Sequence, residues 1–244
     1  MLRRALLSSL VAAAALPAAA AGMPIPGPPS PPPPQVTQLV VFTNGTAKQK
    51  LVRAHRAGVR VGRRHCAVPE GTPLAALVVS RVAKVGLKDF GSCSHRDRDA
   101  AGLFVNSLAG ERNAGEDGWV YKVGRVLATA GAADPAGPFG HGRLKAGSHV
   151  VWFYCHFEGN SCQRTLSFSE IVTRPPGGLE VHVRAYDDRG RGVPAAGATV
   201  HVDTTTGVTG ANGVATIAPG AGTHMMYVEK SGLIRSFTTR VVVQ

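Results

Sequence analysis

The hydrophobic pattern predicts a first region in which β-strands surround one helix. Short hydrophobic runs separated by turn residues predict strands at residues 38–43, 59–68, 103–108, 119–123, 149–155 and 165–172. Thr72 and Pro73 form a helix start signal after the second run, and Gly86 is the expected end of this helix. The hydrophobic residues between them follow helical spacing: Leu74, Leu77, Val78, Val82 and Val85.

The order of these elements predicts an α+β fold. Two strands, one main helix and then several strands are the order of a β-grasp-like domain, to which we assign residues 37–174. Residues 150–154 are apolar on both faces, so we expect them to form a central strand.

A second region rich in strands follows Arg174. Residues 175–178 consist only of Pro and Gly, which is typical of a linker. Beyond them, Leu179, Val181, Val183 and Ala185 alternate with polar residues, as in a half-buried strand. Further short strands at residues 198–202, 213–218, 224–230 and 234–243 predict a small all-β sandwich over residues 179–244.

The N-terminal segment has the pattern of a secretory signal. Arg3 and Arg4 precede an apolar run that ends at Leu16, and small residues follow up to Gly22, which predicts a signal peptide at residues 1–21. Residues 22–36 are rich in proline and predict an extended spacer. The apolar run is short for a membrane span, so we expect a secreted, extracellular protein with no span after signal cleavage.

Cysteine usage fits an oxidising compartment. Four cysteines allow three pairings into two disulfides, and we favour Cys66 with Cys93 and Cys155 with Cys162. The competing hypothesis is a zinc or copper site, because histidines lie beside three of these cysteines: His65, His95 and His156. Such a site would make the protein an extracellular metal-dependent enzyme. The usual metal, nucleophile and nucleotide motifs are missing, so we expect no enzyme activity, cofactor or bound metal.

Positive charge is concentrated in the first region. The chain carries 27 Lys and Arg against 15 Asp and Glu, a net charge of +12, and residues 35–174 account for +9 of it. Arg60, Arg63 and Arg64 are candidate anion-binding residues for a cell-wall or surface polymer, and a solvated basic surface is the alternative. The secretion signal and the lack of a recognition motif argue against nucleic acid.

Four aromatic residues form a second candidate site. Trp119 and Tyr121 share one face of a predicted strand, and Trp152 and Tyr154 share one face of another. They pack in the core or form a shelf that stacks a small flat ligand.

The same two strands carry a family resemblance. Residues 118–124, with the sequence GWVYKVG, and residues 144–154, with the sequence LKAGSHVVWFY, resemble a bacterial family similar to the C-terminal domain of transcobalamin. Gly124 and Ser148 stand where that family usually has Asn and Asp. The resemblance spans residues 59–172 and implies a β-grasp-like fold, with cobalamin-type ligand binding as one alternative function.

The second region carries a shorter resemblance. Residues 197–200 and 209–215 resemble carboxypeptidase-regulatory-like and bacterial Ig-like domains, which implies a spacer or adhesion module. Together, the sequence predicts a secreted bacterial noncatalytic binding or surface-interaction protein for a small flat ligand or an anionic wall polymer. The sequence leaves its oligomeric state open.

Overall fold

The computed structural model describes residues 31–174 and 176–244. These residues form a predominantly β fold with 49% strand and a single α-helix. The expected signal peptide and most of the expected spacer lie outside the described residues, and the last two residues of that spacer already belong to the first strand. No helix of the described part is long and apolar enough to cross a bilayer.

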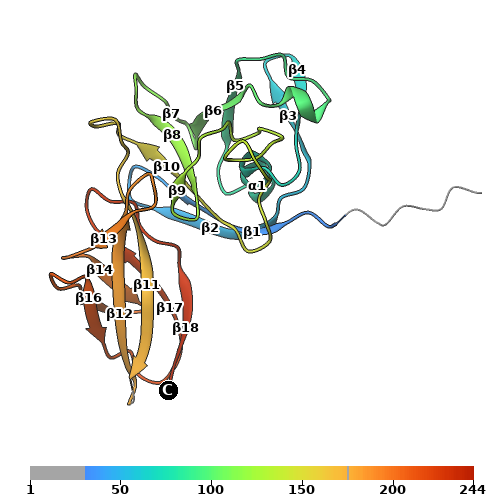
Figure 1. Cartoon of the computed structure of the whole chain (residues 1–244). Helices are drawn as coiled ribbons and strands as arrows, with labels where there is room; N and C mark the ends of the chain where they lie inside the picture. Colours follow the sequence, from blue (N-terminus) through green and yellow to red (C-terminus); the bar gives the residue numbers. More distant parts are fainter. Residues whose placement is uncertain (1–30, 175) are drawn as a thin grey trace, which may run out of the picture. The chain divides into compact units, whose positions relative to one another are not determined.

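A five-stranded sheet organises the first region (Figure 1). Its strands follow the order β2 (Ala47–Arg53), β1 (Gln35–Val41), β10 (His149–Cys155), β8 (Gly118–Val123) and β9 (Val126–Leu127). β1 pairs with β10 in parallel, and the other pairs are antiparallel. Six of the seven β10 residues are buried, which confirms the predicted central strand.

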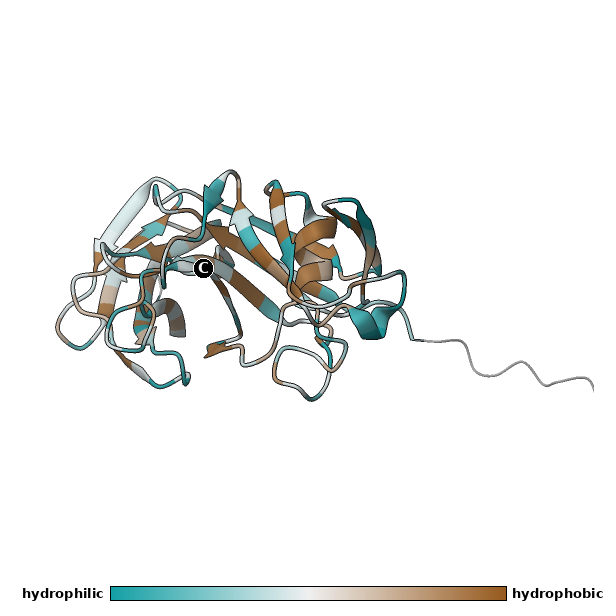
Figure 2. Cartoon of the chain, turned by 90° about the horizontal axis from the view of Figure 1, so that it is seen from above, coloured by the Kyte–Doolittle hydropathy of each residue, from teal (hydrophilic) through white to brown (hydrophobic). Residues whose placement is uncertain are grey.

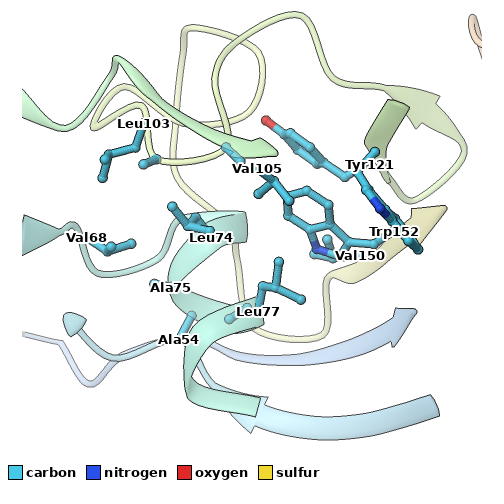
Figure 3. Packing of buried hydrophobic residues seen from close by; sticks show 14 of the residues in the cluster. Ala54, Val68, Leu74, Ala75, Leu77, Leu103, Val105, Tyr121, Val150 and Trp152 are labelled. Atoms are coloured by element: carbon cyan, nitrogen blue, oxygen red, sulfur yellow. The ribbon is translucent and has the colours of Figure 1, made fainter. Parts of the chain in front are cut away.

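Helix α1 (Pro73–Ser80) packs against β1, β2 and β3 (Ala57–Val61) (Figure 1). Thr72 Oγ1 accepts a hydrogen bond from Ala75 N at 3.2 Å, so the predicted N-cap is confirmed. The helix is hydrophobic over most of its surface (Figure 2), and Leu74 and Leu77 face Val105 and Val150 in the core (Figure 3).

The helix ends earlier than the sequence predicts. Ser80 Oγ donates to the Leu77 carbonyl at 2.7 Å and accepts from Val82 N at 3.3 Å, while Arg81 adopts a left-handed conformation with φ 54°. These bonds stop the helix six residues before Gly86. Val85 therefore belongs to strand β5 (Val85–Asp89), and the expected helix end at Gly86 is wrong.

Two small sheets complete the first region. β3 (Ala57–Val61) and β4 (Arg64–Val68) form a hairpin, because Gly62 at φ 59° turns the chain inside the stretch expected as one extended segment. β5 (Val85–Asp89), β6 (Leu103–Leu108) and β7 (Glu111–Arg112) form the other sheet. A 3-10 helix, η1 (Asp97–Asp99), precedes β6.

The C-terminal residues form two four-stranded sheets that share one hydrophobic core. One contains β11 (Thr165–Arg174), β12 (Gly178–Tyr186), β13 (Gly192–Pro194) and β16 (Val214–Ile217). The other contains β14 (Thr199–Val202), β15 (Thr205–Val208), β17 (Gly222–Glu229) and β18 (Thr239–Val243). The predicted alternation is confirmed in β12, where Leu179, Val181, Val183 and Ala185 are buried.

The expected linker lies at a connection between paired strands. β11 pairs antiparallel with β12, and their register ends at Arg174 and Gly178. Residues 165–174, which we assigned to the first domain, therefore share a sheet with the second region. Residues 33–244 form one compact unit, and the face of the central sheet opposite α1 shares a hydrophobic cluster with Ile234.

A buried ion pair also links the two regions within this unit. Lys122 from β8 is fully buried, and its Nζ lies 3.2 Å from Asp188 Oδ1. Nζ donates to the carbonyl oxygens of Tyr186 and Asp187 at 3.3 and 3.1 Å. Burial lowers the pKa of Lys122, and the neighbouring carboxylate of Asp188 partly offsets this effect.

Both predicted disulfide pairs are confirmed. Cys66 bonds to Cys93, and Cys155 bonds to Cys162. The first joins β4 to the loop after β5, and the second closes a short loop after β10. Disulfides of this kind are typical of oxidising compartments.

Candidate ligand-binding groove

An apolar groove lies where β6 faces β8. Its inner part has a volume of about 190 Å³, and its outer part has a volume of about 410 Å³. The two parts share Phe104, Trp119, Val120 and Leu127, so we treat them as one aromatic groove. A cavity of this size suits the apolar portion of a small ligand.

Three phenylalanines line the outer groove and remain exposed to solvent. Phe90 is 76% exposed, Phe104 is 42% exposed and Phe157 is 41% exposed. The rings of Phe90 and Phe104 meet edge to face with their centroids 5.7 Å apart. Exposed apolar side chains that gather around one groove mark a binding surface more strongly than scattered ones do.

The pairing of β5 with β6 positions the first two phenylalanines. Phe104 lies directly opposite Lys88, and Phe90 N donates to the Gly102 carbonyl at 2.9 Å. The backbones come close here, because a Cβ on Gly102 would lie 2.5 Å from Gly91 N. Glycine at position 102 therefore allows the contact that brings Phe90 beside Phe104.

Asn113 closes one end of the gap between β6 and β8. Its Nδ2 donates to the Val105 carbonyl at 3.0 Å, and its Oδ1 accepts from Trp119 N at 2.9 Å. A Cβ on Gly118 would lie 2.7 Å from the Asn113 amide carbon, so glycine makes room for this bridge. The Asn113 amide thus fixes the width of the groove.

Asp117 and the second disulfide hold Phe157 at the rim. Asp117 Oδ1 accepts from Phe157 N at 2.8 Å, and Oδ2 lies 3.0 Å from His156 Nδ1. The backbone bond from Phe157 and the contact with His156 lower the pKa of the Asp117 carboxyl. The disulfide between Cys155 and Cys162 closes the same loop. Phe157 is therefore held both by this covalent link and by the hydrogen bond from its backbone N to Asp117.

Two of the aromatic residues that line the inner groove, Trp119 and Tyr121, use their polar atoms inside the protein. Trp119 Nε1 donates to the Glu111 carbonyl at 3.0 Å, and Tyr121 Oη donates to the Ala130 carbonyl at 2.8 Å. Burial raises the pKa of Tyr121, so its hydroxyl stays protonated at neutral pH. The groove wall therefore offers a ligand mainly apolar aromatic surface.

The four aromatic residues expected to bind ligand are all buried in the core cluster that includes α1. Figure 3 shows two of them, Tyr121 and Trp152, in this cluster. Trp119, Tyr121 and Trp152 line the inner groove, whereas Tyr154 lies outside it. Sequence reasoning missed the exposed Phe90, Phe104 and Phe157. The one available signal was Phe104, which alternates with the buried Leu103 and Val105.

The three arginines expected to bind anions lie on the β3–β4 hairpin and are exposed. Arg64 Nη1 lies 3.3 Å from Asp89 Oδ2, and Arg60 Nε donates to the Gly62 carbonyl. No ion pair involves Arg63 within the described residues. The three side chains therefore differ in what restrains them: an ion pair for Arg64, a backbone hydrogen bond for Arg60 and no ion pair for Arg63.

The histidines of the metal-site hypothesis do not converge. Within residues 31–174 and 176–244, no group of three His, Cys, Asp or Glu side chains is placed to hold a metal ion. All four cysteines are in disulfides. His156 pairs with Asp117, and no hydroxyl or thiol of the described chain hydrogen-bonds to its ring. The competing hypothesis of a zinc or copper site thus has no arrangement of side chains to build on in the described part of the chain.

Comparison with known proteins leaves the geometry as the basis for assigning a function. No family model matches the chain, and no curated protein or solved structure is detectably similar to it.

Proposed function

We propose that this chain is a secreted, noncatalytic binding protein that takes the apolar part of a small ligand into the aromatic groove. The observation that carries the proposal is the clustering of Phe90, Phe104 and Phe157 around one groove of the described chain. A solvated phenylalanine surface loses unfavourable contact with water when an apolar ligand covers it.

The surrounding features support binding rather than catalysis. The groove is held open by the Asn113 side chain, which bridges the backbones of β6 and β8, and by the loop that the second disulfide closes. A rigid frame of this kind lowers the entropy cost of binding. The two disulfides support an extracellular location. A β-grasp-like assignment for the first region and the resemblance to the transcobalamin-like family are part of the same proposal.

Binding of the uncharged fluorophore N-phenyl-1-naphthylamine tests the proposal. Its emission rises in apolar surroundings, so titration with the oxidised full chain gives a dissociation constant. We expect saturable binding that Phe104→Ala weakens about tenfold, because an aromatic contact and its buried area are lost. Phe90→Ala is a second variant with the same expected direction.

Leu51→Ala is the matched control. Leu51 is 59% exposed on β2 and does not line the groove, so its removal changes surface hydrophobicity without changing the site. Circular dichroism checks that each variant keeps the wild-type fold. Lack of saturable binding, or equal weakening by Leu51→Ala and Phe104→Ala, would overturn the proposal.

A further inference from the structure

Lys88 lies within the phenylalanine surface of the groove. It is directly opposite Phe104 across the β5–β6 pair and two residues before Phe90 on the same side of the chain. Its side chain is exposed and lines the outer groove. Among the described residues, no carboxylate lies within ion-pair distance of the Lys88 ammonium group, which leaves this charge available to a ligand.

The carboxylate next to Lys88 is used elsewhere. Asp89 Oδ1 accepts from Gly91 N, and Oδ2 accepts from Cys93 N and from Arg64 Nη1. Neighbouring residues of a strand point to opposite faces, so this network lies away from Lys88. The Asp89 charge therefore does not neutralise Lys88.

The groove also contains two acidic residues, Glu116 and Asp117. Both oxygens of Asp117 are taken by Phe157 N and His156. Glu116 is exposed in the loop between β7 and β8 and lines the same outer groove, but no ion pair among the described residues joins it to Lys88. The net charge of +9 over residues 35–174 adds a long-range attraction for anions.

From this arrangement we infer that the ligand is an anionic amphiphile: an apolar chain or ring system that covers Phe90 and Phe104, with a carboxylate head at Lys88. This inference rests on the proposed function and adds the class of ligand. A phenylalanine surface has no hydrogen-bonding group, so it matches an apolar body, and a single lysine meets the carboxylate as a point charge.

Matched amphiphiles test the inference. Laurate, dodecanol and dodecyltrimethylammonium share a twelve-carbon chain and differ in head charge. Each is titrated as a competitor of N-phenyl-1-naphthylamine for the oxidised full chain, at concentrations below micelle formation. We expect laurate to bind up to about fivefold more tightly than dodecanol, because an exposed charge pair contributes at most a factor of that size.

Lys88→Gln and Lys84→Gln form a matched pair of variants. Both remove one exposed lysine, but only Lys88 lines the groove. We expect Lys88→Gln to abolish the preference for laurate over dodecanol, and Lys84→Gln to keep it. If both variants lose the preference for laurate equally, the preference comes from net charge alone, and the role of Lys88 is overturned.

The outcomes separate the two proposals. If dodecanol binds as tightly as laurate, or dodecyltrimethylammonium binds most tightly, the ligand is not an anionic amphiphile, while the apolar groove still stands. If neither dodecanol nor N-phenyl-1-naphthylamine binds, the proposed function itself fails.

Discussion

The buried pair between Lys122 and Asp188 gives the sharpest test of what holds residues 33–244 together. Lys122→Met keeps most of the apolar stem but removes the ammonium group. It leaves Asp188 Oδ1 buried without its cation and removes the donor to the Tyr186 and Asp187 carbonyls. These losses all favour the unfolded chain, in which water solvates each of these groups.

The structure sets the expected size of this effect. Removing one partner of a buried ion pair costs about 3–5 kcal/mol, and the Asp188 side chain keeps 18% of its exposure, so we expect about 3 kcal/mol. For a unit of this length, a loss of about 3 kcal/mol lowers the midpoint of thermal unfolding by roughly 6–12 °C.

A double-mutant cycle measures the pair itself. Asp188→Asn removes the charge but keeps an oxygen that can accept from Cys162 N, as Asp188 Oδ2 does at 2.9 Å. We expect Lys122→Met and Asp188→Asn together to cost at least about 1 kcal/mol less than the sum of the single variants, because they share one interaction.

Equilibrium unfolding in urea under oxidising conditions provides the free energies. The reasoning is refuted if Lys122→Met costs less than about 1 kcal/mol, well below the usual cost for a broken buried pair. It is also refuted if the two substitutions add to within about 0.5 kcal/mol, which is the behaviour of independent sites.

Three further predictions follow from the disulfides, an acidic loop and the basic hairpin. Replacing Cys155 and Cys162 by Ala opens a loop with a sequence separation of 7, and calorimetry should show a free energy of unfolding about 2.5 kcal/mol lower. Phe157 at the rim should then contribute less to the binding of N-phenyl-1-naphthylamine. Asp187→Asn removes a carboxyl whose pKa is lowered first by the backbone N–H of Arg191. That carboxyl stabilises the protein above its unfolded pKa near 3.8, and the contribution is lost as the pH falls through the lowered folded pKa. The difference in melting temperature between wild type and variant should therefore shrink as the pH falls below about 3.8. Retention on an anionic polymer column should fall, and become less sensitive to salt, when three exposed hairpin arginines are replaced by Gln; unchanged retention would contradict an anion-binding role for Arg60, Arg63 and Arg64.

Local signals in the sequence were sufficient where a few neighbouring residues determine the structure. Thr72 and Pro73 start the helix because the hydroxyl and the fixed proline φ act within one turn. The helix end was not predictable in the same way, because Ser80 also accepts a hydrogen bond from Gln38, 42 residues away in sequence. The disulfide partners were predictable because compartment and chain spacing narrow the choices.

The candidate site depended on contacts that spacing does not encode. Trp119, Tyr121, Trp152 and Tyr154 carried the strongest aromatic signal, yet pairing of β8 with β10 places all four in the core. The groove instead forms between β6 and β8, which the Asn113 side chain joins. Phe90 and Phe157 stand in loops without periodicity, so no hydrophobic pattern distinguishes them.

The parallel pair of β1 and β10 has a consequence for the order of folding. Thr37 lies beside His149, so more than one hundred residues separate the two strands in the chain. Closing so long a segment costs entropy before the paired strands compensate it, which slows the folding of non-local sheets. A chain emerging N-terminus first therefore has no completed central sheet until β10 has emerged.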